Sequence, residues 1–417
     1  MTFFKSTHFI SRVSKLRPRI SRLFIGCWIV FIGFVPLLSA QEFFDFDKSE
    51  VFDEVSNAVK DHFYDRKFDA GEWQKRSTPF RERALSAKSL DQFDSVVNEL
   101  LATLNASHTN YFSRRNPKRY QLFGVFNKLY EDDESLFCYD GIGIDTKSVD
   151  GRTLIVSIYD GLPAAKSGLR FGDEIVSVDG KPFHPIGSFF QKSGVSTKVE
   201  LLRVGKRLFI DVEVEKLDGR TMFETALESS VAVIERGEHK IGYLHVWSYA
   251  GSQYQEKVRE TLLWGKLSKC DSLVFDLRDG WGGADLNYLN LFRPAIAVVE
   301  SESRTSEPKS YSGVWEKPIA VLTNDRSTSG KELFTFGFKK LKLGKVFGGT
   351  TAGAVVAGRI FPLSNGDVLY LASADVRVDG KRLEGVGVAP DVVVERPIES
   401  SNVDPQLEAA LKYLESK

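Results

Sequence analysis

The amino-acid sequence predicts a multidomain α/β protein with three parts: an N-terminal helical domain, a β-rich middle domain, and a C-terminal α/β core with a sheet flanked by helices. Apolar residues recur at spacings of three and four in residues 42–113, and strand-like alternation dominates residues 121–216. Strand and helix patterns then alternate through residues 231–398. A chain of 417 residues has room for two or three hydrophobic cores.

Residues 1–40 have the pattern of an export signal. A basic, acid-free stretch over residues 1–22 precedes an apolar run from Leu23 to Leu38, and the small-residue sequence "SAQE" follows. We expect cleavage after Ala40 and a mature protein in the periplasm or cell envelope. The alternative is an uncleaved anchor that would hold the chain at a membrane, although the apolar run is slightly short for a span.

Residues 41–118 form the predicted helical domain. The stretch "SEVFDEVSNAVKDHFYD" places five apolar residues on one helix face: Val51, Phe52, Val55, Val59 and Phe63. The stretch "SLDQFDSVVNELLATL" repeats this pattern, with Ser89 as the expected N-cap. The domain ends in "NASHTNYF".

Residues 119–217 form the predicted middle domain, with strands "TLIVSIY", "KVELLRV" and "RLFIDVEVEKL". The stretch "PAAKSGLRFGDEIVSVDG" resembles the signature of a PDZ domain. The sequence "GIGI" resembles the carboxylate-binding loop of such a domain, and comprises Gly141, Ile142, Gly143 and Ile144. Its backbone N–H groups would hold a peptide's terminal carboxylate while the peptide adds to the sheet edge. Taken alone, the loop could simply be a glycine-containing start of a strand.

Residues 218–417 form the predicted α/β core, with the strands "KIGYLHVW", "DSLVFDL" and "PIAVLT" and a final amphipathic helix "DPQLEAALKYL". The chain has 56 acidic and 56 basic residues, so no nucleic-acid partner is expected. No CxxC or HExxH occurs, and we expect neither a metal nor an organic cofactor. Cys138 and Cys270 would either pair in an oxidising compartment or remain as two buried thiols.

The stretch "NDRSTSGKE" follows the apolar run "PIAVLT", where a buried strand should give way to a helix. It offers three hydroxyls: Ser327, Thr328 and Ser329. A serine at a helix N-terminus lies where free N–H groups and the helix dipole stabilise developing negative charge. Serine and threonine also cap helices at this position, which is the structural alternative.

Together with "LNASHTNYF", "IGYLHVWSYA", "LVFDLRDGWGGA", "GTTAGA", "LEGVGVAPD" and "DPQLEAAL", these motifs resemble the tail-specific, or C-terminal processing, serine peptidases over residues 45–415. The resemblance implies that Ser329, in a Ser-x-x-Glu pattern with Glu332, is the nucleophile. It implies an oxyanion hole formed by the N–H of Gly330 and that of Gly282 or Gly283. Glycine is needed there because the backbone must approach the substrate carbonyl closely.

The better-known branch of this family uses a lysine as base, and that position falls on Ala354. Lys331 is close in sequence, but its spacing places it on a different helix face from Ser329, and we expect it to be solvated. The motifs "TTAG" and "SHT" resemble the tricorn-core branch instead. That resemblance implies His108 as base, with Ser107 and Glu384 supporting it.

The lysine-dependent branch also has a histidine at the position of His108, where it does not act as base, and Glu384 could equally form a structural ion pair. His245, in "YLHVW", is the next histidine to consider. The expected function is an exported serine endopeptidase that acts on polypeptides whose free, apolar C-termini bind the PDZ domain. The alternative is an inactive relative that serves as a peptide-binding scaffold. A further partner that we consider is an adaptor protein.

Overall fold

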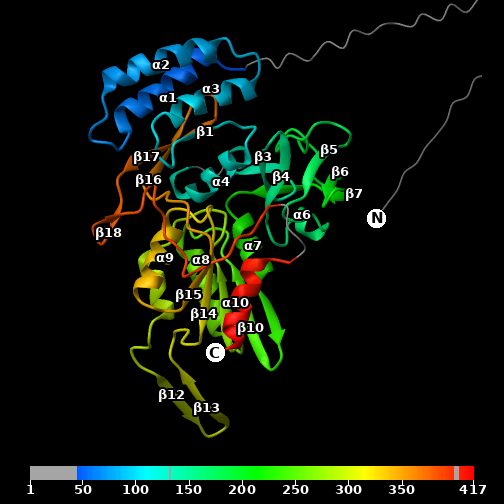
Figure 1. The fold of residues 1–417 in the computed structure, drawn as a ribbon, viewed down its shortest axis with the longest axis vertical. Coiled ribbons are helices and arrows are strands. Elements are labelled where there is room, and N and C mark those ends of the chain that lie inside the picture. The colour runs from blue at the N-terminus through cyan, green and yellow to red at the C-terminus, as the bar shows by residue number, and fades with distance from the viewer. Residues whose placement is uncertain (1–44, 131–132, 399–402) are drawn as a thin grey trace, which may run out of the picture. The chain divides into compact units, whose positions relative to one another are not determined.

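The computed structural model describes residues 45–130, 133–398 and 403–417, so the expected export signal and its cleavage site lie outside the described residues. The described residues form a mixed α/β structure with N-terminal helices, an antiparallel sheet domain and a larger sheet-based core, which confirms the predicted fold class (Figure 1). No helix within these ranges is long and apolar enough to cross a membrane.

Three helices begin the described chain: α1 (Lys48–His62), α2 (Ala70–Leu85) and α3 (Leu90–Ala102). The predicted apolar face of α1 is buried through four of its five residues, and Phe63 packs at the edge of the same cluster. Ser89 caps α3 by accepting a hydrogen bond from the N–H of Gln92 at 3.2 Å. The periodicity of the stretches that form α1 and α3 therefore predicted their buried faces correctly.

A three-stranded sheet joins this helical region to the C-terminal part of the chain. Strand β1 (Asn110–Phe112) pairs antiparallel with β17 (Val368–Ala374), which pairs with β16 (Ala357–Pro362). Apolar side chains of β17 lie in one hydrophobic cluster with α1, α2 and α3 (blue in Figure 1). The segment that begins directly after "NASHT" is thereby fixed against residues more than 250 positions later.

The middle domain is a five-stranded antiparallel sheet in the order β3-β4-β5-β6-β7. Its strands are β3 (Ile144–Val149), β4 (Arg152–Ile158), β5 (Glu174–Val178), β6 (Ser196–Arg203) and β7 (Lys206–Glu213). Strands β2 (Cys138–Gly141) and β8 (Glu215–Asp218) pair beside it, and α6 (Pro163–Lys166) follows β4. Helices α4 (Pro117–Val125), η1 (Asn127–Leu129) and α5 (Glu134–Phe137) lead into this domain.

The core sheet has six strands in the order β20-β15-β14-β11-β10-β9, and all except β9 are parallel. They are β9 (Ala232–Arg236), β10 (His239–His245), β11 (Ser272–Asp276), β14 (Ile319–Thr323), β15 (Lys345–Gly348) and β20 (Val392–Val393). Its helices are α7 (Met222–Ser230), α8 (Ser252–Leu263), η2 (Leu286–Phe292), α9 (Gly330–Lys340) and α10 (Pro405–Glu415). Every residue of β11 and β14 is buried, as expected for parallel strands covered on both faces.

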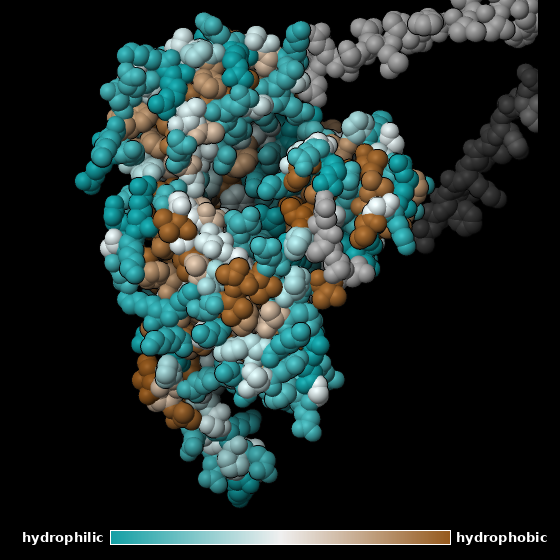
Figure 2. All heavy atoms as spheres, in the orientation of Figure 1, coloured by the Kyte–Doolittle hydropathy of each residue, from teal (hydrophilic) through white to brown (hydrophobic). Residues whose placement is uncertain are grey.

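Two short hairpins extend from the core: β12 (Val299–Ser303) with β13 (Ser306–Tyr311), and β18 (Arg377–Val378) with β19 (Lys381–Arg382). The first hairpin is exposed along its whole length, and its surface is largely hydrophilic or neutral (Figure 2). Cys138 and Cys270 are both free thiols, in agreement with the unpaired alternative, although only Cys270 is buried and Cys138 is half-buried.

Candidate active site

Ser329 occupies a sharp turn between the buried strand β14 and helix α9. Its φ of 56° and ψ of −123° are rare for a residue with a side chain, and such strain persists only where the surroundings enforce it. Its N–H donates to the carbonyl of Ala354 at 2.8 Å and to the Glu332 carboxylate at 3.0 Å. These two contacts hold the strained residue, with its half-buried side chain, at the N-terminus of α9.

The neighbouring hydroxyl of Ser327 is used by the turn itself. Ser327 is fully buried, its Oγ donates to the carbonyl of Leu277 at 2.9 Å, and the same oxygen accepts from the N–H of Asn324 at 3.1 Å. Of the three hydroxyls in the sequence, Ser327 is therefore structural.

The glycines of "DGWGG" lie directly against Ser329 and Gly330. A Cβ on Gly282 would lie 2.6 Å from the Cβ of Ser329, and a Cβ on Gly330 would lie 2.7 Å from the N of Gly283. Neither position can hold a larger residue without moving backbone. Among the described residues, the N–H groups of Gly282, Gly283 and Gly330 donate to no acceptor. Three free backbone donors thus lie in the stretches that contain or directly contact Ser329 and Gly330.

His108 lies beside β1, in a turn where it also has a positive φ, of 53°. Its Nδ1 lies 2.9 Å from the Oγ of Ser107, which donates to the Glu384 carboxylate at 3.0 Å. The N–H of Ser107 donates to the same carboxylate at 2.9 Å. The imidazole also packs edge-on against Tyr370 of β17, with ring centroids 5.0 Å apart. The structure therefore brings together the three residues predicted on the base side.

Glu384 accepts two further hydrogen bonds, from the N–H of Val355 at 2.7 Å and of Val356 at 3.0 Å. Burial acts to raise the pKa of Glu384, but the hydrogen bonds from Ser107, Val355 and Val356 outweigh it, and the pKa is lowered. Glu384 is thus ionised near neutral pH. Burial lowers the pKa of His108 to about 4, against the opposing effect of Glu384.

A second carboxylate, Glu332 of α9, holds the other side of the same segment. It is fully buried and accepts from the hydroxyl of Thr351 at 2.7 Å and from the N–H groups of Gly353 at 2.7 Å and Ala354 at 2.8 Å. Residues 351–356 are therefore clamped between Glu332 on the Ser329 side and Glu384 on the His108 side. The Ser-x-x-Glu spacing identified Glu332, but nothing local indicated Thr351.

Across residues 45–130, 133–398 and 403–417, no hydrogen bond joins the Ser329 hydroxyl to the His108 ring. The two are linked through the 351–356 segment, since Ala354 contacts Ser329 and its neighbour Val355 contacts Glu384. Catalytic hydrogen bonds often form only once substrate is bound, so a shared site does not require this bond in the free protein.

His245 is engaged elsewhere. Its Nε2 lies 2.8 Å from the carbonyl of Arg278, and its ring stacks on Trp247 at 3.7 Å. It lines a separate cavity of about 960 Å³, together with Asp160 and Arg278. The His245 ring is thus held by Arg278 and Trp247, and no hydrogen bond joins it to Ser329 among the described residues.

The expectation that Lys331 is solvated is wrong. Its side chain is fully buried, and its Nζ donates to the carbonyl of Asp279 at 2.6 Å. The spacing argument was correct that it does not face Ser329, but the face that it does occupy is covered by the loops that follow β10 and β11.

The loop "GIGI" lines a groove of about 390 Å³ beside β3. Among the described residues, the N–H groups of Ile142 and Gly143 donate to no acceptor, and Gly143 has a φ of 78°. Successive free N–H groups in such a turn form a concavity that favours an anion. Lys118 and Arg326, from outside the middle domain, also line this groove.

Comparison with known proteins finds two family profiles that match parts of the chain. Residues 240–394 match the profile of Peptidase family S41, and residues 141–214 match that of a PDZ domain. The chain is 23% identical to the carboxy-terminal processing protease CtpB of Bacillus subtilis over 340 residues, which cover 76% of this chain and 66% of that protein. It is 25% identical to the tricorn protease of Thermoplasma volcanium over 395 residues, which cover 88% of this chain and 36% of that protein.

Among solved structures, the crystal structure of the tricorn protease superposes with a TM-score of 0.52 at 19% identity, covering 88% of this chain and 36% of that one. At this identity the likeness shows the shared fold. The chain spans about a third of the tricorn protease and just under two thirds of CtpB.

Proposed function

This chain carries an S41 peptidase domain and a PDZ domain, and on that premise we propose that it is an exported serine endopeptidase with a Ser-His-Glu arrangement. The hydrogen-bonded series from Glu384 through Ser107 to His108 is the observation that carries the proposal. It supplies a base where Ala354 replaces the lysine of the better-known branch.

The tautomer of His108 follows from this series. Ser107 has one hydroxyl proton and donates it to the ionised Glu384, so its oxygen accepts from Nδ1–H of His108. The Nε2 atom is then the unprotonated nitrogen and can take a proton. Glu384 stabilises the imidazolium that forms, and Ser107 transmits that effect.

In the proposed mechanism, the Oγ of Ser329 attacks the scissile carbonyl while Nε2 of His108 removes its proton. The N–H of Gly330 and that of Gly282 or Gly283 stabilise the oxyanion, because they are fixed donors beside Ser329. The imidazolium returns the proton to the leaving amine, and water then hydrolyses the acyl-enzyme by the same route.

The PDZ domain is proposed to bind the free C-terminus of an extended polypeptide. The free N–H groups of Ile142 and Gly143 support this, as does the cationic side chain of Lys118, which lines the groove. The basic and apolar pattern of residues 1–40 supports export to the periplasm or cell envelope, and sequencing of the mature N-terminus tests it. A start near Gln41 is expected, and retention of Met1 would contradict cleavage.

Labelling by a fluorophosphonate probe tests the activity. The purified wild-type chain should be labelled and the Ser329→Ala variant should not, since the probe needs an activated serine. An exposed serine elsewhere serves as control: Ser95→Ala should be labelled as the wild type is. A folded wild-type chain that binds peptides but resists the probe would instead support the inactive scaffold.

A further inference from the structure

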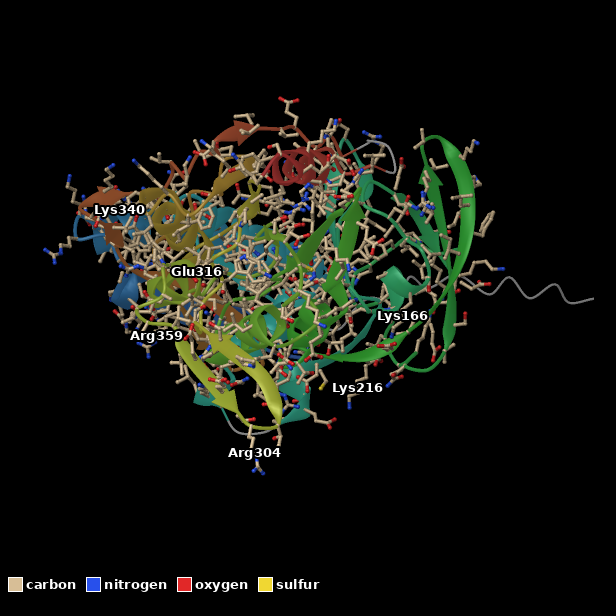
Figure 3. All side chains as sticks on the ribbon, turned by 90° about the horizontal axis from the view of Figure 1, so that it is seen from below. Lys166, Lys216, Arg304, Glu316, Lys340 and Arg359 are labelled. Atoms are coloured by element: carbon tan, nitrogen blue, oxygen red, sulfur yellow. The ribbon has the colours of Figure 1, made fainter. Side chains whose placement is uncertain are left out.

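Lys331 is a buried ionisable side chain that the proposed mechanism does not use. It is the second residue of α9, two positions after Ser329, and its side chain is completely covered. Its Nζ donates to the carbonyl oxygens of Asp279 at 2.6 Å and Trp247 at 3.4 Å. By contrast Lys340, at the other end of this helix, is exposed at the outer edge of the molecule (Figure 3).

The two carbonyls belong to the loops that follow β10 and β11, next to Ser329. Asp279 and Gly280 both have positive φ, of 57° and 67°, and the N–H of Trp281 donates to the Trp247 carbonyl at 2.8 Å. Gly282 and Gly283 come directly afterwards and contact Ser329 and Gly330. One amine therefore joins the nucleophile helix to the strained turn that presents the oxyanion donors.

The charges around Lys331 are satisfied by other groups. Asp279 accepts from Asn324 at 2.6 Å and from Arg326 at 2.8 Å, and Asp276 pairs with Arg278. The His245 ring lies 4.0 Å from Asp276. Burial lowers the pKa of Lys331 to about 7, although Asp279 and Asp276 act to raise it.

An apolar side chain would fill this volume without the cost of burying an amine. What an apolar side chain lacks is a donor for the two carbonyls. Lys331 is also unsuited to act as the base, because its donated hydrogen bonds go to Asp279 and Trp247 and none goes to Ser329.

We propose that Lys331 is a positioning residue for the oxyanion hole, which fixes the 279–283 turn so that its glycine N–H groups face the oxygen of the carbonyl group that Ser329 attacks. This inference rests on the proposed peptidase function. It predicts that Lys331 affects the chemical step more than substrate binding, because the oxyanion develops only in the transition state.

The test compares Lys331→Met, which keeps the length of the side chain but removes the donor, with Lys340→Met as the matched control. Lys331→Met should lower kcat for a peptide substrate by about 10- to 100-fold, the scale of an ångström-sized misplacement, and leave KM within about twofold. Lys340→Met should match the wild type. An unchanged kcat in folded Lys331→Met, or a loss confined to KM, would overturn the proposal.

Lys331→Gln keeps a neutral donor on a shorter side chain and should fall between the wild type and Lys331→Met. If Lys331→Met does not fold, the test is the comparison of Lys331→Gln with the wild type. A lowered kcat with an unchanged KM supports the proposal, and a wild-type kcat contradicts it.

Amide hydrogen exchange of the 279–284 segment, measured in the Ser329→Ala background, gives a readout that needs no activity. Exchange there should quicken in Lys331→Met and not in Lys340→Met, while the first turns of α1 stay unchanged. Uniformly faster exchange would mean a general loss of stability and would contradict a local role. If the wild type resists the fluorophosphonate probe, the peptidase proposal fails, whereas this measurement still decides whether Lys331 holds the turn.

Discussion

The two sides of the proposed catalytic site are built in different ways. The nucleophile side consists of short stretches at the ends of adjacent parallel strands, where a strained Ser329 meets the glycines of the next loop. The base side joins Ser107 and Glu384, which are 277 positions apart, through the pairing of β1 with β17 and two hydrogen bonds. Local backbone geometry determines one side, and tertiary packing determines the other.

This difference has consequences for how each side fails. On the nucleophile side, positions such as Gly282 and Gly330 have room for glycine but not for a side chain. A single added methyl group there should therefore cause a large loss of activity. On the base side, each hydrogen bond in the Glu384–Ser107–His108 series contributes to the basicity and orientation of the imidazole. Losing one of them should reduce the rate by degrees and not abolish it.

The largest loss of activity is expected when the proton donor, Ser329, or the proton acceptor, His108, is removed. Ser329→Ala and His108→Ala should each lower kcat by about 10⁴-fold or more, and the double variant should be little worse, because members of one catalytic unit are not additive. Active-site titration and steady-state assays measure this. Full activity in purified, folded His108→Ala would show that the base side takes no part in the mechanism.

A smaller loss is expected when the support of the imidazole is weakened. Glu384→Gln should lower kcat by about 10²- to 10³-fold, since it removes the charge that stabilises the imidazolium, and Ser107→Ala should lower it by about 10-fold or more. Glu72→Gln, at an exposed ion pair on α2, is the control and should leave kcat unchanged. If both Glu384→Gln and Ser107→Ala kept wild-type rates, the hydrogen-bonded series would be structural only.

The PDZ groove resembles the nucleophile side, because its anion-binding groups are backbone N–H groups of one short stretch. Peptides with free, apolar C-termini should therefore bind more tightly than the same peptides amidated, by about 1–3 kcal/mol for the loss of a charge-assisted hydrogen bond. Isothermal titration with the Ser329→Ala chain measures this without cleavage. Equal affinities for the two forms would show that the groove does not recognise a carboxylate.

The smallest expected effect is a weak response to moderate acid. A histidine base acts in its neutral form, so the rate falls as pH drops through its pKa, and burial lowers the pKa of His108 to about 4. Between pH 7 and pH 5.5, kcat/KM should then change by less than about twofold, whereas an unperturbed histidine would give a loss of about tenfold. A pH profile of the wild type decides between them, and an acidic limb near pH 6.5 would contradict the buried environment described for His108.

Much of the fold follows from patterns that are local in sequence. The spacing of Val51, Phe52, Val55 and Val59 predicted the buried face of α1, and the apolar run before Asn324 predicted a fully buried strand. The order of the motifs also predicted the PDZ and S41 domains that the comparisons identify. The predicted domain limits at residues 118 and 217, and the catalytic role of each site residue, remain predictions.

Local patterns did not show which distant segments would meet. Nothing in "NASHT" indicates that β1 pairs with β17, or that the clamped segment 351–356 lies between Glu332 and Glu384. These contacts depend on how separately predicted elements pack, and no periodicity within one element encodes that information.

The sequence by itself determined the main helices and strands, the change from strand to helix at Ser329 and the need for glycine at the proposed oxyanion positions, because backbone sterics act over a few residues. Lys331 shows what only the tertiary structure decided. Its helical position places it away from Ser329, and a lysine on a free helix face would be solvated. In the folded chain the loops bearing Trp247 and Asp279 cover that face, so the same side chain becomes a buried donor to two carbonyls beside the proposed oxyanion hole.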